Sequence, residues 1–335
     1  MKKILITGGA GYIGSHVTRQ LSETGRMPVV YDNLSTGFRE ALLHGETLIQ
    51  AELSDADRLD SVFDRYPIDT VMHFAASIVA PESVTAPVRY YENNTGSTIG
   101  LLKVCSRRVI KNFIFSGTAS VYGIPAGGAA SEDAPTNPIN PYGASKLMSE
   151  RIIADAAKAH GFRFVVLRYF NVAGADPQAR MGQRSKNATH LLKVCCQAAL
   201  GMRESVSIYG DDYDTPDGTG VRDYIHVEDI AQAHLDALVY LESGGESLVV
   251  NAGYGRGYSV REVIKAVQEV TGRTFTTVVA PRRPGDPPVL IAKADRIRKN
   301  LNWSPRYNDL ARIVEDAWRW EKKLYGSANG QDYSR

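Results

Sequence analysis

The sequence predicts an α/β protein built on a doubly wound parallel sheet, followed by a smaller C-terminal α/β domain. Two observations lead to this fold class. Short runs rich in valine, isoleucine and phenylalanine alternate with helix-length segments over the first half of the chain. These runs are nearly continuous in apolar residues, which is typical of strands whose sheet is covered by helices on both faces.

The elements follow one another in a regular order. Six strands are expected, at Lys3–Thr7, Pro28–Asp32, Thr47–Leu53, Thr70–Ala75, Asn112–Gly117 and Phe162–Phe170. A helix from about Tyr12 to Thr24 follows the first strand. A second well-marked helix begins at Pro141, because proline suits a first helical turn and good helix formers follow it.

The chain is expected to divide into two domains, residues 1–175 and 176–335, with residues 222–250 returning to the first. Beyond residue 171 the pattern loosens. A stretch rich in glycine and aspartate at 210–220 and a proline-rich stretch at 281–288 indicate a domain built largely from loops. Because loops on a rigid scaffold commonly carry binding groups, the second domain is expected to bind a ligand.

Composition argues against several kinds of partner. The chain is 43% hydrophobic and 23% charged with a formal net charge of +2, so it creates no strong field for nucleic acid or a membrane surface. The N-terminal apolar run is too short for a signal peptide or a membrane span, and a cytoplasmic protein is expected. Cys105, Cys195 and Cys196 lack metal-ligand spacing and the histidines form no metal motif, so reduced thiols and no metal site are expected.

A glycine-rich turn follows the first expected strand. Gly8, Gly11 and Gly14 have the spacing GxxGxxG and lead directly into the first expected helix. Glycine is needed where backbone amides at a helix N-terminus approach a pyrophosphate closely. The next strand ends in Asp32, whose carboxylate can accept hydrogen bonds from adenosine ribose hydroxyls and repels a 2′-phosphate. This order of elements predicts a Rossmann-type site that prefers NAD to NADP.

A second constellation lies in the helix that begins at Pro141. Tyr142 and Lys146 are four residues apart and therefore lie on one helical face. A tyrosine that acts as a base near neutral pH needs its pKa to fall by about 3 units from about 10. A neighbouring ammonium group and a positively charged nicotinamide favour the phenolate. Ser116 and Thr118 end the preceding strand, where ligands bind in such sheets and a hydroxyl can bridge substrate and Tyr142.

These segments resemble the extended short-chain dehydrogenase/reductase family, and within it the enzymes that epimerise carbon 4 of UDP-sugars, over nearly the whole chain. The matching segments are GGAGYIGSH at 8–16, YDNLSTG at 31–37, HFAA at 73–76, YYENN at 90–94, FSGTASVYG at 115–123, NPYGASKLMSE at 140–150, LRYFNVAGA at 167–175, DGTGVRDYIHVEDI at 217–230 and PRRPGDPP at 281–288. The last three extend beyond cofactor binding and are similar to the nucleotide-sugar elements of the family.

The resemblance implies three sets of site residues. The catalytic residues would be Tyr142, Lys146 and Thr118. The residues expected around NAD are Gly8, Gly11, Tyr12, Ile13, Gly14, Asp32, Asn33, Thr36, Gly37, Glu52, Leu53, Phe74, Ala75, Ala76, Asn93, Ser116, Tyr142, Lys146 and Tyr169. The residues expected around the UDP-sugar are Thr118, Tyr142, Asn171, His190, Leu191, Tyr209, Arg222, Arg283 and Asp286. Arginines suit diphosphate oxygens, an aromatic ring can stack on uracil, and a carboxylate can accept hydrogen bonds from ribose hydroxyls.

The activity that the resemblance implies is the interconversion of UDP-glucose and UDP-galactose through transient oxidation at carbon 4. Tyr142 takes the proton of the 4-hydroxyl while Thr118 hydrogen-bonds that oxygen and hydride passes to NAD. The 4-keto sugar then rotates in the site and receives the hydride on its opposite face. Lys146 holds the nicotinamide ribose and lowers the pKa of Tyr142.

Two other functions share these motifs. Sugar-nucleotide dehydratases place an Asp-Glu pair beside the active-site threonine, whereas Ala119 and Ser120 follow Thr118 here, so simple epimerisation is favoured. A non-catalytic NAD-binding protein would tolerate loss of the tyrosine, yet Tyr142 and Lys146 are both present. Reduction of bound NAD by UDP-sugars distinguishes the enzyme from such a binding protein.

Several positions bear on affinity, specificity and assembly. Glu52 stands where an aspartate often meets adenine, and residues 77–79 read Ser-Ile-Val where many members carry a lysine near the cofactor, so weaker NAD binding is expected. Leu290 occupies the position that limits space at carbon 2 of the sugar, which implies some activity toward N-acetylated sugars, and UDP-pentoses also stay open as substrates.

The resemblance implies a homodimer through helices around Val88–Arg108 and Ser145–Ala159, although the same apolar residues could pack on the sheet.

Overall fold

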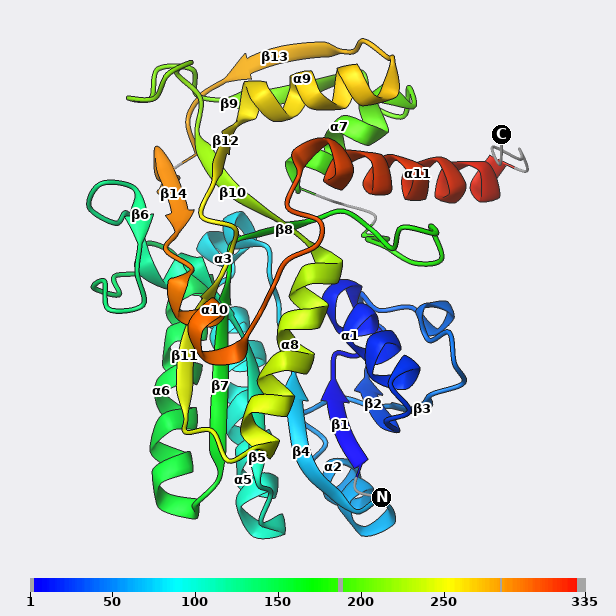
Figure 1. Ribbon diagram of the computed structural model, residues 1–335, viewed down its shortest axis with the longest axis vertical. Coiled ribbons are helices and arrows are strands. Elements are labelled where there is room, and N and C mark those ends of the chain that lie inside the picture. The colour runs from blue at the N-terminus through cyan, green and yellow to red at the C-terminus, as the bar shows by residue number, and fades with distance from the viewer. Residues whose placement is uncertain (1–2, 186–188, 284, 330–335) are drawn as a thin grey trace.

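The computed structural model describes residues 3–185, 189–283 and 285–329 and shows two lobes of unequal size (Figure 1). The larger lobe contains a seven-stranded sheet in the order β11-β7-β5-β4-β1-β2-β3. Every pairing in this sheet is parallel. The expected doubly wound parallel α/β fold is therefore confirmed.

The strands of the large sheet agree closely with the expected segments. They are β1 Lys3–Thr7, β2 Pro28–Asp32, β3 Thr47–Gln50, β4 Ile68–His73, β5 Asn112–Thr118, β7 Arg163–Tyr169 and β11 Leu248–Ala252. Strand β3 ends earlier than expected because the chain turns there into the next helix, whose N-cap Asp55 accepts a hydrogen bond from the Arg58 amide at 2.9 Å. The seventh strand, β11, was not among the six expected; it is a short run at the sheet edge beside β7.

Helices cover both faces of this sheet. On one face lie α1 (Tyr12–Glu23) and α8 (Val227–Glu242), which share an apolar cluster with Ile4 and Ile6 of β1. On the other face lie α2 (Ala56–Arg65), α5 (Ser97–Arg108) and α6 (Pro141–His160), which share a second cluster with Leu5. Consecutive residues of β1 thus serve opposite cores, as the alternation of side chains along a strand requires.

Helix α6 carries Tyr142 and Lys146, and its start is fixed by local signals. The Asn140 side chain accepts a hydrogen bond from the Gly143 amide at 2.8 Å, and Pro141 occupies the first turn. Gly161 ends the helix in a left-handed conformation with φ +75°, which glycine adopts without strain. These caps place Tyr142 in the first helical turn, beside the carboxyl end of β5.

The smaller lobe is organised around β10 (Val221–His226), which pairs with β8, β12 and β14. The other strands are β6 Ala129–Ala130, β8 Asn171–Ala173, β9 Ser205–Tyr209, β12 Gly257–Ser259, β13 Thr276–Ala280 and β14 Val289–Ala292. The helices packed around a third apolar cluster are α7 Leu191–Ala199, α9 Val260–Thr271 and α11 Leu310–Asn329. Because β10 leads directly into α8, the chain passes from this lobe back onto the large sheet (Figure 1).

The remaining short elements connect the two lobes and the sheet. They are η1 Arg39–Ala41, α3 Ala80–Thr85, α4 Pro87–Tyr90, the π-helical turn η2 Tyr91–Gly96, η3 Ala119–Tyr122 and α10 Asp295–Leu301. Among the described residues, none of the helices has the length and apolar character needed to span a membrane. Those same residues contain no group of three metal-ligating side chains.

Candidate active site

The glycine turn after β1 closes against the chain that follows β4. Gly8 has φ +72°, and a Cβ there would lie 2.6 Å from the backbone nitrogen of Ala75. A Cβ on Gly14 would lie 2.2 Å from the carbonyl oxygen of Gly8. Helix α1 starts immediately afterwards, and its N-cap Gly11 provides no side-chain hydrogen bond, so the first-turn amides are free to meet an anion. The close packing explains why glycine is required at Gly8 and Gly14.

Asp32 ends β2 beside this turn. Its carboxylate accepts hydrogen bonds from the backbone amides of Ala10 at 2.9 Å and Leu34 at 2.8 Å. Burial nonetheless raises its pKa from the ordinary value, since desolvation outweighs the two amides. Nearby, the Asn33 amide donates to both carboxylate oxygens of Glu52 at 3.1 and 3.0 Å. Asn33 and Glu52, which are both expected near the adenosine, thus contact each other. The glutamate side chain, longer than the aspartate often found at this position, therefore reaches the end of β2.

Most of the expected cofactor residues lie at or after the carboxyl ends of adjacent parallel strands. They lie after β1 (Gly8, Gly11, Tyr12, Ile13, Gly14), at or after β2 (Asp32, Asn33, Thr36, Gly37), after β3 (Glu52, Leu53), after β4 (Phe74, Ala75, Ala76), near the end of β5 (Ser116) and at the end of β7 (Tyr169), whereas Asn93 lies in η2 and Tyr142 and Lys146 lie in α6. In a parallel sheet these ends form one edge, which is where ligands bind in open α/β folds. The structure therefore gathers segments that are far apart in the sequence.

Thr118, Tyr142 and Lys146 meet at this edge. A side-chain hydrogen bond joins Thr118 to Tyr142, and the Thr118 hydroxyl also accepts a hydrogen bond from the Ser120 amide at 3.2 Å. Lys146 is buried one turn further along α6, with its Nζ 4.2 Å from the centroid of the Phe115 ring. Tyr142 and Thr118 are thus held in contact, and Lys146 lies one helical turn further along α6.

The protein by itself does not lower the pKa of Tyr142. Burial raises that pKa above its ordinary value, and the hydrogen bond from Thr118 opposes the rise only in part. Burial also lowers the pKa of Lys146 to about 7, with the Glu150 carboxylate acting in the opposite direction. A positive charge from outside the chain is therefore needed to favour the phenolate.

A second tyrosine beside this group is held neutral. Tyr169 hydrogen-bonds Ser116, and its hydroxyl lies 2.5 Å from Nε2 of His234. His234 Nδ1 is 2.8 Å from the Ile230 carbonyl oxygen, so Nδ1 carries the proton and Tyr169 donates to Nε2. Burial raises the pKa of Tyr169, which keeps it a neutral donor near Tyr142.

In the smaller lobe the expected substrate residues contact one another. Arg222 of β10 forms an ion pair with Asp286. The Arg283 guanidinium lies 3.8 Å above the centroid of the Tyr209 ring. Strand pairing places Leu290 of β14 beside Arg222 and Asn171 of β8 beside Tyr224, both on β10. Four of the expected residues are therefore present as two pairs, and Arg222 of one pair shares β10 with the strand partner of Asn171.

A sequence model of the NAD dependent epimerase/dehydratase family matches residues 4–253. The chain belongs to this family. Its relatives include a UDP-glucose 4-epimerase of Azospirillum brasilense, 54% identical over 96% of this chain and 92% of the relative. The crystal structure of UDP-glucose 4-epimerase from Brucella ovis in complex with NAD matches with a TM-score of 0.92 at 42% identity, covering 95% of this chain and 98% of that one. The UDP-Glc/GlcNAc 4-epimerase from Campylobacter jejuni matches with a TM-score of 0.84 at 48% identity, covering 96% and 100%.

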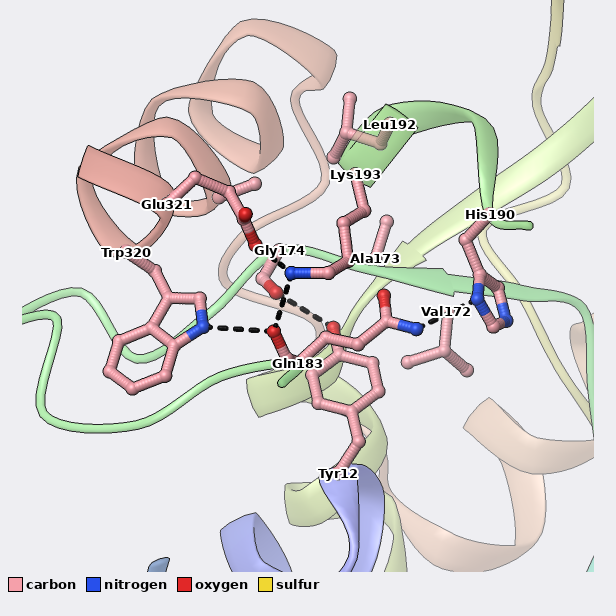
Figure 2. A pocket seen from close by; sticks show the side chains of 11 residues that line it. Tyr12, Val172, Ala173, Gly174, Gln183, His190, Leu192, Lys193, Trp320 and Glu321 are labelled. Carbon is pink, nitrogen blue, oxygen red and sulfur yellow. Dashed lines mark hydrogen bonds and ion pairs between the residues drawn. The ribbon is translucent and has the colours of Figure 1, made fainter. Parts of the chain in front are cut away.

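In this member of the epimerase/dehydratase family, a small cavity between the lobes is lined both by a residue expected at NAD and by a residue expected at the UDP-sugar (Figure 2). Tyr12, expected at NAD, donates from its hydroxyl to the Gly174 carbonyl at 2.7 Å. His190, expected at the UDP-sugar, is 2.8 Å from the Gln183 side-chain nitrogen and begins α7, directly before Leu191. The buried ion pair of Lys193 and Glu321 closes the cavity on the side of α11. The side chain of Tyr12 thus points toward the smaller lobe.

Sequence reasoning missed two polar residues of this edge. His234 fixes Tyr169, but it lies in α8 just beyond the matching segment 217–230 and was not among the expected residues. Asn94 accepts a hydrogen bond from the Ser77 amide at 2.7 Å and donates to the Ser145 hydroxyl at 3.0 Å. Asn94 adjoins the expected Asn93 in the π-helical turn η2, and such turns are frequent at functional sites. The matching segment YYENN at 90–94 overlaps this turn, but the resemblance assigned only Asn93 to the cofactor.

Proposed function

We propose that this chain interconverts UDP-glucose and UDP-galactose as an NAD-dependent 4-epimerase. The observation that carries the proposal is the contact of Thr118 with Tyr142, which lies one helical turn before Lys146. These residues lie at or beside the carboxyl ends of the parallel strands, as the glycine turn does. The relatives at 54% identity and the NAD-bound structural relative support the same activity. We assign residues 1–175 and 222–250 to the cofactor domain and the rest of 176–335 to the UDP-sugar domain.

The residues at the sheet edge fit NAD. The turn at Gly8 and Gly14 has no room for a Cβ, and the first-turn amides of α1 lack a side-chain cap, as a bound pyrophosphate requires. Asp32 is placed to accept hydrogen bonds from the adenosine ribose and to repel a 2′-phosphate. When bound, NAD supplies the hydride acceptor and donor for carbon 4 of the sugar, and its positive nicotinamide ring.

Tyr142 acts as the base that takes the proton of the sugar 4-hydroxyl and later returns it. Its contact with Thr118 lets the threonine hydroxyl bind the same sugar oxygen. Lys146, buried one turn away, holds the nicotinamide ribose and contributes positive charge that favours the Tyr142 phenolate. Tyr169 stays protonated through His234 and therefore does not compete as a base.

The smaller lobe holds the UDP part of the substrate. Arg222 and Arg283 bind diphosphate oxygens, for which guanidinium groups are well suited. Asp286 then exchanges its ion pair with Arg222 for the hydroxyls of the uridine ribose, and Tyr209 stacks on uracil. Asn171, His190 and Leu191 line the path between the diphosphate and the sheet edge.

We further infer a cytoplasmic homodimer. Val88, Ile99 and Met148 are exposed apolar side chains of α4, α5 and α6, at 65%, 37% and 46% exposure. A groove between α5 and α6 is lined by Leu102, Ile152 and others, and a second copy of the same helices would cover it. The three free cysteines are buried, which suits a reducing compartment. Light scattering that finds only monomer at micromolar concentration would contradict the dimer.

The test of the function uses the purified protein with UDP-galactose and no added NAD. Formation of UDP-glucose is followed enzymatically while the absorbance of reduced cofactor is recorded. Turnover is expected, because the glycine turn and Asp32 retain NAD through purification. Turnover only after NAD is added would mean that Glu52 and Ile78 weaken cofactor binding. Failure of both assays would contradict the proposed activity.

Epimerisation of N-acetylated UDP-sugars is a second candidate activity. Leu290 of β14 is paired with Arg222 and is only 8% exposed, so a compact side chain borders the substrate strand at this point. The structural relative from Campylobacter jejuni is described as a UDP-Glc/GlcNAc 4-epimerase. We expect measurable turnover of UDP-GlcNAc in the same assay, and undetectable turnover would exclude this activity.

A further inference from the structure

A buried ion pair lies directly behind the catalytic helix. Glu150 of α6 and Arg168 of β7 are each 6% exposed. Nη2 of Arg168 lies 2.7 Å from Oε2 of Glu150, and Nε lies 3.2 Å from both carboxylate oxygens. Burying two charges costs desolvation that their attraction offsets only in part, so stability alone is a weak reason for such a pair. Neither residue belongs to the cofactor or substrate sets.

The pair is part of a network that joins four elements. Nη1 of Arg168 donates to the Tyr122 hydroxyl at 2.9 Å, and that hydroxyl donates to Oδ1 of Asn251 at 2.6 Å. Tyr122 belongs to η3, which begins immediately after Thr118, and Asn251 belongs to β11. The network therefore ties α6 to the segment that carries Thr118.

Glu150 also lies close to the end of β5, where only a glycine leaves room for its carboxylate. A Cβ added to Gly117 would lie 3.2 Å from Oε1 of Glu150, and Gly117 is in register with Arg168 across the β5–β7 pairing. Glu150 is thus held between α6 and the residue that precedes Thr118. Any shift of α6 along the strand would separate Tyr142 from Thr118 and break the ion pair at the same time.

The carboxylate is the negative charge that acts on Lys146. Lys146 and Glu150 are four residues apart on α6 and therefore lie on one helical face. Burial lowers the pKa of Lys146 to about 7, and the Glu150 carboxylate acts to raise it. From β4, His73 faces Lys146, but burial lowers its pKa to about 3 and keeps it neutral. Asn94 and Thr95, which contact α6 at Ser145 from η2, are neutral as well. Glu150 itself faces Arg168 from β7 and Tyr122 from η3.

We propose that Glu150, held by Arg168, is a positioning residue that fixes the catalytic helix against Gly117 and keeps the positive charge on Lys146. The consequence for turnover rests on the proposed epimerase function. The consequence for the charge of Lys146 does not, and the two can be measured separately.

The experiment compares Glu150→Gln, which removes the charge, with Glu150→Asp, which retains it, in the NAD-loaded protein. The titration of Lys146 is followed by NMR in protein labelled with ¹³Cε-lysine, and its signal is assigned with Lys146→Arg. In Glu150→Gln we expect Lys146 to titrate roughly one pH unit lower than in the unmodified protein. In Glu150→Asp, Lys146 should titrate close to the pH at which it titrates in the unmodified protein. At pH values above the Lys146 titration, Glu150→Gln should lower kcat for UDP-galactose about tenfold, while KM stays within about twofold.

Two further variants separate positioning from stability. Val62→Ala removes buried volume in α2, far from the site, and should lower the melting temperature without moving the Lys146 titration. If Glu150→Gln does not fold, Glu150→Gln combined with Arg168→Gln leaves no unpaired buried charge. That double variant should fold and still show a lower Lys146 titration, because Glu150 is the charge that acts directly on Lys146. An unchanged titration in the folded charge-removing variants overturns the proposal. A shifted titration in a protein without epimerase turnover supports the proposal and contradicts the proposed function instead.

Discussion

The proposed catalytic edge of the larger lobe and the proposed UDP-binding part of the smaller lobe are built in different ways. At the catalytic edge, Thr118 and Lys146 are 7% and 2% exposed, and hydrogen bonds and a buried ion pair support the helix and strand that carry them. In the smaller lobe, Arg222 and Asp286 are 12% and 34% exposed and neutralise each other. The first region has its side chains oriented without a ligand, whereas the second keeps its charges in internal pairs, which the proposed substrate would replace.

The difference separates two kinds of contribution to rate. Groups that are already oriented act mainly in the transition state, so their loss should lower kcat. Groups that exchange an internal partner for the substrate contribute mainly to binding, so their loss should raise KM. Substitutions in the two regions should therefore have different kinetic signatures.

The largest effect is expected from Tyr142→Phe. This change removes the hydroxyl that exchanges the sugar proton and leaves the ring in place. We expect kcat for UDP-galactose to fall at least about a thousandfold, with KM within a few-fold and an unchanged melting temperature. Steady-state kinetics and thermal unfolding of the same preparation measure all three. A loss in kcat of less than tenfold would mean that another group is the base.

The contact between α1 and α8, on one face of the large sheet, provides a test on stability. Glu228 at the start of α8 is bound by His16, Arg19 and Gln20 of the cofactor helix α1, and these partners lower its pKa to about 2. Because the folded pKa lies below the unfolded value, the stabilisation is present above about pH 4.5 and is lost as pH falls toward 2. Glu228→Gln should therefore lower the free energy of unfolding at pH 7 by about 3 kcal/mol.

Urea unfolding at a series of pH values measures this difference, which should narrow as pH falls below about 4.5. Glu242→Gln is the matched control, since Glu242 pairs with Arg26 at the surface with 41% exposure. It should cost no more than about 1 kcal/mol. Equal losses in the two variants would show that the α1–α8 contact is no stronger than a surface ion pair.

A smaller and different effect is expected from Arg222→Leu. Losing one charge-assisted contact with the diphosphate should raise KM for UDP-galactose roughly thirtyfold while kcat changes less than about threefold. Arg261→Leu is the control, because Arg261 is an arginine of the same lobe with 46% exposure, 4.0 Å from Asp211. A loss in kcat that exceeds the rise in KM would remove the distinction between the two regions.

The smallest effect concerns the choice of sugar. Leu290→Tyr adds bulk beside β10 without a change in charge, so it should reduce turnover of UDP-GlcNAc several-fold more than turnover of UDP-galactose. Parallel assays of the two substrates measure this ratio. An equal loss for both would show that Leu290 does not border carbon 2 of the sugar.

Much of the larger lobe could be predicted from the sequence because its signals are local. The apolar runs of β1, β2 and β5, the glycine turn and the four-residue spacing of Tyr142 and Lys146 each lie within a single element or turn. The substrate residues of the smaller lobe were named only through a family resemblance, since loop arginines carry no local signal. The edge strand β11 was missed because a short run at the edge of a sheet resembles many loop segments.

The sequence by itself therefore determined most elements of the larger lobe, NAD as the cofactor and the identity of the candidate catalytic tyrosine and lysine. Only the tertiary structure decided which side chains meet. Arg222 and Asp286 are 64 residues apart, Tyr12 and Gly174 are 162 apart, and Tyr169 and His234 are 65 apart. The charge state of Lys146 depends in addition on its burial and on Glu150, which Arg168 holds in place. Such contacts follow from strand register and helix packing, which join distant segments and leave no pattern in the sequence near either residue.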